Sequence, residues 1–326
     1  MHQLIRYKNL LFIAIIQLLI AKAVIAPTLA MFHVPEFTPE WLLLCMILST
    51  MFIAAGGYVI NDYFDLKIDR INRPEKVMIG VMIEKSGAMR LYQVLTGIGI
   101  VLGLFIAFYL RSMTLGFIYI VVPGMLWFYS ASYKRQLIIG NLIVALAAAL
   151  VPLMPLISES TLITNNYGAL IQKTVILKTL YAWVCGFSGF AFIWTFIREI
   201  IKDMEDVTGD RELECHTIPV VYGLMWSKII VTLLIVIACV ILGFIVATCI
   251  QLPNDGSLTL RYFLFGIVTP SICLIAILWN KSCKAYKNAS TLSKFIMLIG
   301  VFYSLIYYFI IARAYGLPFL EIFQVI

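Results

Sequence analysis

Charged residues are scarce in this chain: Asp, Glu, Lys and Arg make up only 13% of the 326 residues, whereas 62% are hydrophobic. With a mean hydropathy of +0.99, this composition indicates an integral membrane protein. The alternating ten-residue segments of a membrane β-barrel are also missing. Because lipid cannot satisfy backbone hydrogen bonds, a chain without a barrel has to span the membrane as helices, so we predict an all-α fold.

Two other absences limit the domain organisation. The seven cysteines include no CxxC pair, so we predict packing residues rather than disulfides or a zinc site. No polar linker or low-complexity segment is long enough to separate soluble domains. We therefore expect one membrane domain over residues 1–326.

The apolar segments predict a polytopic protein. A spanning helix needs about 20 mostly apolar residues. Nine stretches qualify, near residues 9–31, 41–60, 88–109, 114–132, 137–157, 179–198, 228–250, 262–280 and 295–314. We expect one bundle of about nine helices under a cap of cytoplasmic loops. The first stretch could instead be a signal peptide, but an uncleaved helix fits the remaining loops better.

The basic residues predict an orientation rather than a nucleic-acid partner, despite the net charge of +7. If the N-terminus is cytoplasmic, most of the 24 Lys and Arg fall on the cytoplasmic side. The positive-inside rule therefore favours that orientation, in a prokaryotic cell membrane.

Two aspartate clusters with equal internal spacing contain all but one of the chain's aspartates: Asp62, Asp65 and Asp69, then Asp203, Asp206 and Asp210. On a helix this spacing keeps the carboxylates on one face. Each cluster follows a predicted helix that runs from outside to inside, the second and the sixth. Both clusters are therefore expected on the cytoplasmic side, close together.

Six carboxylates at a membrane boundary favour a divalent cation. Ionised groups are costly in lipid, so they must be neutralised or line a wet cavity. Oxygen ligands suit Mg²⁺, and proteins usually share this ion with a phosphate group. Cations beside the clusters could contact the remaining phosphate oxygens: Lys67, Arg70, Arg73, Lys202 and Arg211. The alternative, two solvated charge runs in loops, does not explain the matched spacing.

These motifs resemble the UbiA superfamily of intramembrane prenyltransferases. The family's first signature, N-x-x-x-D-x-x-x-D, reads here as Asn61, Asp65 and Asp69, with Asp62 as an extra acid. The second signature reads as Asp206 and Asp210, extended backwards by Asp203. The resemblance spans nearly the whole chain. It implies that Asn61 and all six aspartates hold Mg²⁺, and that Asp65, Asp69, Asp206 and Asp210 are catalytic.

The resemblance implies transfer of a long prenyl chain from a polyprenyl diphosphate to a lipid or aromatic acceptor in the membrane. The motifs look closest to the branch that acts on geranylgeranylglyceryl phosphate. An aromatic prenyltransferase of quinone biosynthesis, acting on a hydroxybenzoate, naphthoate or homogentisate, is the alternative. A cation-coupled transporter is a remoter one, because transporter acids usually lie near the midplane at broken helices.

Further substrate contacts follow from the same resemblance. After the fourth helix, YSASYKRQLIIGN resembles the loop in which a tyrosine and a lysine approach the diphosphate, here Tyr129 or Tyr133 with Lys134. Arg73 of INRPEK is the preferred diphosphate contact in the first basic loop, with Arg70 second.

Two polar residues in or near the spans, Asn141 and Lys22, each have two possible roles. Asn141 resembles the asparagine of the family's Gly-Asn pair before the fifth helix, and it could equally cap that helix. Lys22, inside the first span, could anchor an anionic acceptor or extend to the outer interface.

Overall fold

The protein is described by a computed structural model that covers residues 4–72, 74–280, 284–319 and 323–324. Within these ranges, nine helical segments are long and apolar enough to cross a membrane, so the predicted number is confirmed. They are α1 (Tyr7–Leu19) continued by a π-helix (Ile20–Ile25) and α2 (Ala26–Met31), α3 (Glu40–Phe64), α5 (Lys85–Leu110), α6 (Met113–Ala131), α7 (Ile139–Tyr167), α8 (Val175–Glu212), α10 (Gly223–Thr248), α11 (Leu258–Tyr262) continued by a second π-helix (Phe263–Val268) and α12 (Thr269–Leu278), and α13 (Ala285–Tyr315).

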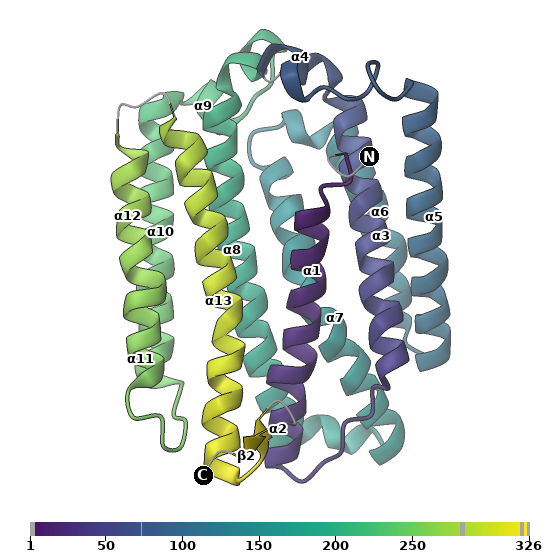
Figure 1. Cartoon of the computed structure of the whole chain (residues 1–326), viewed down its shortest axis with the longest axis vertical. Coiled ribbons are helices and arrows are strands. Elements are labelled where there is room, and N and C mark those ends of the chain that lie inside the picture. The colour runs from purple at the N-terminus through teal and green to yellow at the C-terminus, as the bar shows by residue number, and fades with distance from the viewer. Residues whose placement is uncertain (1–3, 73, 281–283, 320–322, 325–326) are drawn as a thin grey trace.

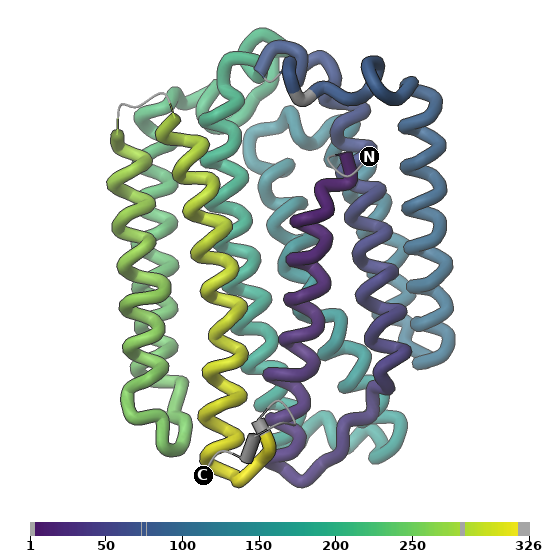
Figure 2. The backbone as a smooth tube through the Cα atoms, in the orientation of Figure 1, coloured from purple at the N-terminus to yellow at the C-terminus, as the bar shows by residue number. Residues whose placement is uncertain are grey.

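The spans form one bundle, and short elements lie at its two ends (Figures 1 and 2). The helices α4 (Leu66–Asn72) and α9 (Ile218–Val221) lie at one end, where α3 and α8 also finish. We call this the aspartate end. The first described residues also lie toward it, whereas α2 and the short strands β1 (Pro318–Phe319) and β2 (Phe323–Gln324) lie at the opposite end. Three 3₁₀ turns complete the loops, at Pro74–Lys76, Tyr133–Arg135 and Ala169–Lys173.

Small residues allow the helices to approach closely, as is common between membrane helices. In α5, a Cβ atom at Gly103 would come within 2.3 Å of the Tyr119 ring of α6. In α13, a Cβ atom at Gly300 would come within 2.1 Å of the Phe190 ring of α8. Glycine at these positions therefore lets an aromatic ring pack directly against the neighbouring backbone.

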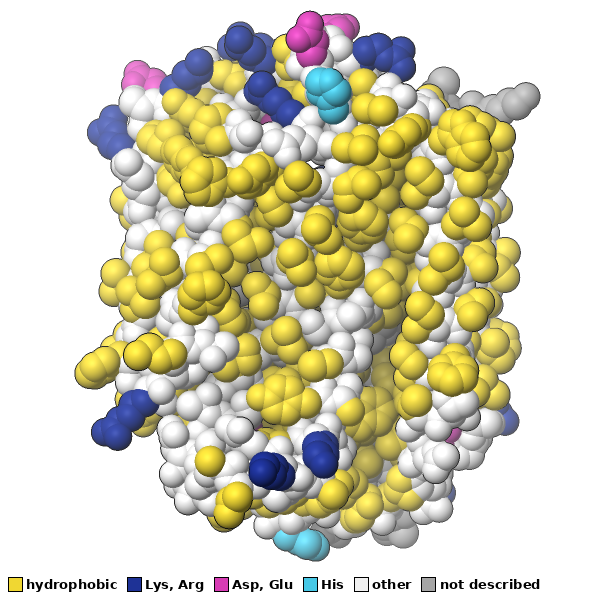
Figure 3. All heavy atoms as spheres, turned by 180° about the vertical axis from the view of Figure 1, so that it is seen from behind, with side chains coloured by type: hydrophobic (Ala, Val, Ile, Leu, Met, Phe, Trp, Pro, Cys, Tyr) yellow, Lys and Arg dark blue, Asp and Glu magenta, His cyan; other side chains and the backbone are white. Residues whose placement is uncertain are grey.

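Apolar and charged side chains occupy different parts of the surface along the bundle (Figure 3). Apolar side chains cover the length of the visible face, and Lys and Arg side chains lie at both ends, most densely at the aspartate end. This distribution suits a protein whose middle lies in hydrocarbon and whose ends lie in the interfaces.

Several spans extend beyond the predicted apolar stretches. The helix α8 continues to Glu212, past the predicted end near residue 198, and α13 begins at Ala285 rather than near residue 295. Polar residues outside the hydrocarbon continue the helices, because a helix satisfies its backbone equally well in water. The second aspartate cluster therefore lies on α8 itself rather than in the loop after it.

Candidate functional site

The two clusters have different backbones. Asp203, Asp206 and Asp210 share one uninterrupted helix, α8, as their spacing predicts. The first cluster crosses the break between α3 and α4, with Asp65 at the break. The hydrogen-bond ladder continues through it, since the Asp65 amide donates to the Asn61 carbonyl at 2.9 Å. The expectation of a single helical face is thus corrected for this cluster, because the chain bends within it.

Asn72 joins the two clusters. Its side-chain amide, at the end of α4, donates to the Asp206 carbonyl at 3.1 Å. Its Oδ1 accepts a hydrogen bond from the Gly209 amide at 3.0 Å. A Cβ atom at Gly209 would lie 2.6 Å from the Asn72 amide nitrogen, so glycine makes room for this contact. The two clusters are therefore tied together by one asparagine.

Lys134 reaches the first cluster from the turn after α6. Its ammonium pairs with the Asp65 carboxylate, which is only 5% exposed. Asn61 donates to the same carboxylate at 2.7 Å. Although burial opposes a charge on Lys134, the Asp65 and Asp69 carboxylates raise its pKa, so it remains a cation. A positive charge is thus fixed within the first cluster.

One pocket collects residues from both clusters. Its walls are formed by Asp65, Ile68, Ser130, Lys134, Arg135, Asp203, Asp210, Cys215 and Thr217. Asn141 donates to the Asp203 carboxylate at 2.8 Å, so this side chain orients an aspartate and does not cap α7. The Thr217 hydroxyl donates to Asp210 at 3.4 Å. Both second-cluster carboxylates in the pocket are therefore held by neutral donors.

The other aspartates differ in environment. Asp62, predicted as a metal ligand, instead pairs with Arg6, whose Nη2 lies 2.6 Å from its Oδ1. This pairing neutralises the carboxylate, and the role of Asp62 as a metal ligand stays a prediction. Burial, together with repulsion from Asp65, raises the pKa of Asp69 to about 6. Crowded carboxylates of this kind favour the binding of additional positive charge.

The donor set fits Mg²⁺, provided that other ligands complete the coordination. In the described ranges no three His, Cys, Asp or Glu side chains are grouped as ligands of one ion. Mg²⁺ does not require such a group, since proteins usually bind it through one or two carboxylates, water and substrate phosphates. The pocket offers carboxylates of both clusters, with the Asn61 amide beside them.

The predicted cationic contacts lie in different places. Arg73 lies outside the described residues. Arg70 is exposed, with its guanidinium beside Gly80, and Arg211 is exposed near the end of α8. Lys202 donates to Glu199 at 2.7 Å. None of these described cations is a wall of the pocket.

The two tyrosines predicted as possible partners of Lys134 lie in different environments. The Tyr133 ring packs beside Phe128, with centroids 6.2 Å apart. Tyr129 is half-buried on α6 and lies within electrostatic range of Lys134, Asp65 and Asp203. Its position therefore favours Tyr129 over Tyr133 as the partner of Lys134.

Lys22 belongs to a different network. It lies in the π-helix before α2, toward the end of the bundle opposite the clusters. Its ammonium pairs with Glu36 at 2.9 Å and Glu40 at 2.5 Å. The prediction of a substrate contact is therefore corrected: Lys22 is held by carboxylates on the loop before α3 and at the start of α3.

Two charged residues near the clusters were not predicted. Arg6 could not be paired with Asp62 from the sequence, because 56 positions separate them. Glu199 accepts from Arg198 at 2.8 Å as well as from Lys202, and it is only 5% exposed. A sequence signal for Glu199 existed, since it lies four positions before Asp203 and so shares its helical face.

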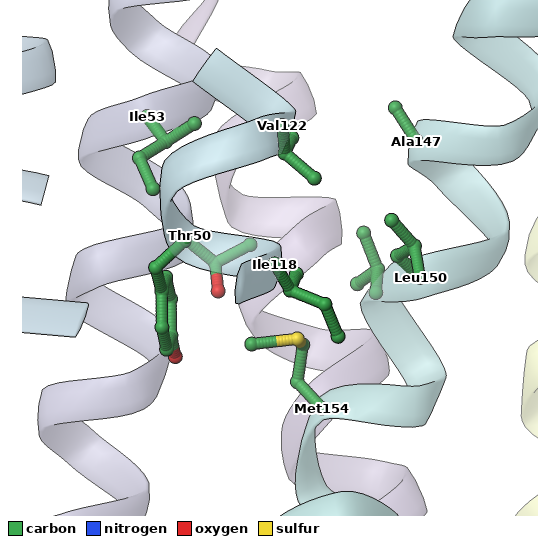
Figure 4. Close-up of a pocket in the computed structure, with 9 residues that line it drawn as sticks. Thr50, Ile53, Ile118, Val122, Ala147, Leu150 and Met154 are labelled. Atoms are coloured by element: carbon green, nitrogen blue, oxygen red, sulfur yellow. The ribbon is translucent and has the colours of Figure 1, made fainter. Parts of the chain in front are cut away.

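A second pocket is apolar and lies within the bundle (Figure 4). It is lined by side chains of α3, α6 and α7: Thr50, Ile53, Ile118, Tyr119, Val122, Ala147, Leu150, Val151 and Met154. Such walls suit a hydrocarbon chain, because they offer dispersion contacts and few polar groups.

Known proteins are similar to this chain in sequence. A protein of Methanosphaera stadtmanae named digeranylgeranylglyceryl phosphate synthase is 35% identical over 192 residues, covering 59% of this chain and 62% of the relative. A protein of the same name from Sulfolobus acidocaldarius is 32% identical over 74% of this chain and 76% of the relative. The chain thus matches less than two thirds of the length of the first relative and more than two thirds of the second.

Solved structures have the same fold. A solved digeranylgeranylglyceryl phosphate synthase aligns with a TM-score of 0.60 and 24% identity, over 94% of this chain and 96% of the other. A UbiA homologue from Archaeoglobus fulgidus bound to GPP and Mg²⁺ aligns with a TM-score of 0.58 and 13% identity, over 92% and 97% of the two chains. A model of the UbiA prenyltransferase family matches residues 19–306, which is most of the chain. The protein therefore belongs to the UbiA prenyltransferase family.

Proposed function

We propose that this protein is a Mg²⁺-dependent membrane prenyltransferase that transfers a geranylgeranyl chain from its diphosphate to geranylgeranylglyceryl phosphate. The observation that carries the proposal is the shared pocket, in which carboxylates of both clusters surround Lys134. The names of the relatives support this donor and acceptor, and a fold neighbour bound to GPP and Mg²⁺ supports the metal.

In this proposal, Asn61, Asp65 and Asp69 hold Mg²⁺ on one side of the pocket, and Asp203, Asp206 and Asp210 do so on the other. Bound Mg²⁺ neutralises the charge that develops on the departing diphosphate. Lys134 contributes a fixed positive charge to the same group and orients it. Asn141 and Thr217 keep the Asp203 and Asp210 carboxylates aimed into the pocket.

The prenyl chain requires a dry environment after its bond to oxygen breaks, since water would capture the allylic cation. The apolar pocket between α3, α6 and α7 provides hydrocarbon contacts within the bundle. We assign the prenyl chain of the donor to this side of the bundle. Membrane lipid surrounds the protein, and the acceptor arrives from it.

The whole chain acts as one membrane domain in this proposal. The concentration of Lys and Arg at the aspartate end supports a cytoplasmic location for that end and for the N-terminus. The organisms of the relatives support a prokaryotic cell membrane.

Purified protein, incubated with geranylgeranyl diphosphate and geranylgeranylglyceryl phosphate, should release pyrophosphate only with Mg²⁺. The conservative variants Asp65→Asn and Asp210→Asn should each lose about 10²-fold or more in rate, since both remove charge next to the leaving group. Asp255→Asn is the matched control, because Asp255 is the one aspartate outside the clusters. Unchanged turnover in both cluster variants would rule out the proposed site.

The acceptor is tested in the same reaction. Mass spectrometry of products from a panel of acceptors should show the ether lipid as the main product. A prenylated hydroxybenzoate, naphthoate or homogentisate would instead identify a quinone-pathway enzyme. A cyclised prenyl product formed without any acceptor would identify a terpene cyclase.

A further inference from the structure

Four basic side chains gather beside the aspartate pocket. Arg6 comes from the segment before α1, Arg198 and Lys202 from α8, and Lys294 from α13. Arg198, Lys202 and Arg6 all lie within electrostatic range of Lys294. We call these four residues the basic cluster. Three separate parts of the chain thus bring positive charge to one place.

Neighbouring carboxylates balance only part of this charge. Glu199 accepts hydrogen bonds from Arg198 and Lys202, and Asp62 pairs with Arg6. Asp65 also lies within electrostatic range of Arg6, and Asp203 of Lys202, so Lys294 is the member of the basic cluster without a carboxylate in direct contact among the described residues.

Two hydrogen-bond donors of the basic cluster have no acceptor among the described residues. Lys294 is exposed and makes no hydrogen bond or ion pair with another described residue. The Nε atom of Arg198 is buried and has no hydrogen-bond partner among the described residues. A buried guanidinium donor without an acceptor is costly, so Arg198 keeps a hydrogen-bond donor for a further acceptor.

The basic cluster is separate from the aspartate pocket but adjacent to it. None of its four residues is a wall of that pocket. Glu199 nevertheless lies within electrostatic range of Lys134, which is a wall. The Arg6 guanidinium lies over the Tyr58 ring, 5.0 Å from its centroid, which places this part of the cluster against α3. The aspartate pocket and the basic cluster therefore lie side by side.

We propose that the basic cluster binds the phosphate headgroup of the acceptor lipid, with Arg198 and Lys294 as its direct contacts. The inference rests on the proposed function, in which both substrates are anionic: the donor diphosphate takes the aspartate pocket and the acceptor phosphate takes the basic cluster. A phosphate monoester is an anion near neutral pH, so its oxygens can accept hydrogen bonds from both Arg198 and Lys294. Glu199 and Asp62 act as positioning residues that orient Arg198, Lys202 and Arg6.

Lys294→Gln provides the first test, because this exposed side chain contributes to no described hydrogen bond and its replacement should leave the fold intact. The binding of geranylgeranylglyceryl phosphate is measured without donor or Mg²⁺, in nanodiscs of neutral phosphatidylcholine. Loss of one charged contact should weaken binding about tenfold. Lys294→Arg should bind almost normally. Lys287→Gln, an exposed lysine on the same helix, is the matched control and should bind like the wild type.

The same ether lipid without its phosphate, geranylgeranylglycerol, separates headgroup recognition from tail binding. Its binding should be the same in wild type and Lys294→Gln. Equal binding of the phosphorylated lipid by Lys294→Gln and Lys287→Gln would overturn the inference, as would an equal loss for both lipids in Lys294→Gln. Turnover with Mg²⁺ is measured separately. A selective loss of phosphate binding in a protein without transferase activity would refute the proposed function and still support the basic cluster.

Discussion

Lys134 is the residue on which the charge balance of the aspartate pocket depends. It carries the positive charge that pairs with Asp65, and its backbone is held against Gly140, where a Cβ atom would come within 2.9 Å of the Lys134 Cα. The side chain therefore has a fixed starting point. Fixed charges of this kind stabilise a transition state without reorganising during the reaction.

Replacing Lys134 with Gln should lower kcat by about 10²-fold, because one preorganised charge next to the leaving group is removed. Lys134→Arg should recover part of the rate, since the charge returns on a larger group. Steady-state kinetics with saturating donor and acceptor will measure both. A kcat for Lys134→Gln within twofold of the wild type would contradict the role given to this residue.

Glu159 is a residue whose importance is structural. Its carboxylate is 1% exposed and accepts hydrogen bonds from the Phe37 amide at 2.7 Å, the Thr38 amide at 2.9 Å and the Thr38 hydroxyl. It thereby holds the loop that connects α2 with α3. This arrangement lies at the end of the bundle opposite the clusters.

Glu159→Ala should destabilise the protein by about 2–4 kcal/mol, because several buried donors lose a charged acceptor. Thermal unfolding in detergent should show a lowered midpoint, while kcat at low temperature stays near that of the wild type. Asp65→Asn should instead lower kcat and leave the unfolding midpoint near that of the wild type. Loss of kcat in Glu159→Ala at full stability would argue for a functional role instead.

At the scale of elements, the contact between α4 and α8 decides whether the two clusters face one pocket. Asn72 makes both hydrogen bonds of this contact, and Gly209 provides the space for it. The break between α3 and α4 at Asp65 allows α4 to lie against α8.

Asn72→Ala and Gly209→Ala should therefore lower activity by similar amounts, roughly five- to tenfold, since about 1–1.5 kcal/mol accompanies the loss of such bonds. In Gly209→Ala the new methyl group displaces the Asn72 amide. The double variant should be no worse than either single one, because both changes remove the same contact. Additive losses in this double-mutant cycle would show that the two residues act independently.

The elements also show how much the sequence could predict. The number of spans was predictable, because hydropathy alone selects stretches of sufficient length. The ends of α8 and α13 were not, because helices continue outside the hydrocarbon without an apolar signal. Local spacing revealed the clusters, whereas the partners of Asp62 and Lys22 depend on tertiary packing: Arg6 lies 56 positions from Asp62, and Glu36 lies 14 positions from Lys22 in the loop that follows. Lys134 was identified through the family resemblance, since nothing in its local pattern points to Asp65.

At the scale of the whole molecule, the end of the bundle that carries the clusters is also the end where Lys and Arg side chains are densest. A protease site inserted between residues 77 and 84, at the aspartate end, should be cut only in inside-out vesicles. A site inserted between residues 251 and 256, in the loop after α10, should be cut only in right-side-out vesicles. Immunoblotting of the fragments gives the orientation, and the opposite pattern would reverse the proposed topology.

The salt bridge between Arg6 and Asp62 has a practical consequence for work with this protein. It attaches the first described residues of the chain to the first signature motif, so an affinity tag or fluorescent fusion at the N-terminus would pull on a residue beside the reaction centre. The C-terminal strands lie at the far end of the bundle. Tags for purification and labels for imaging therefore belong at the C-terminus, where added mass is separated from the chemistry by the full height of the bundle.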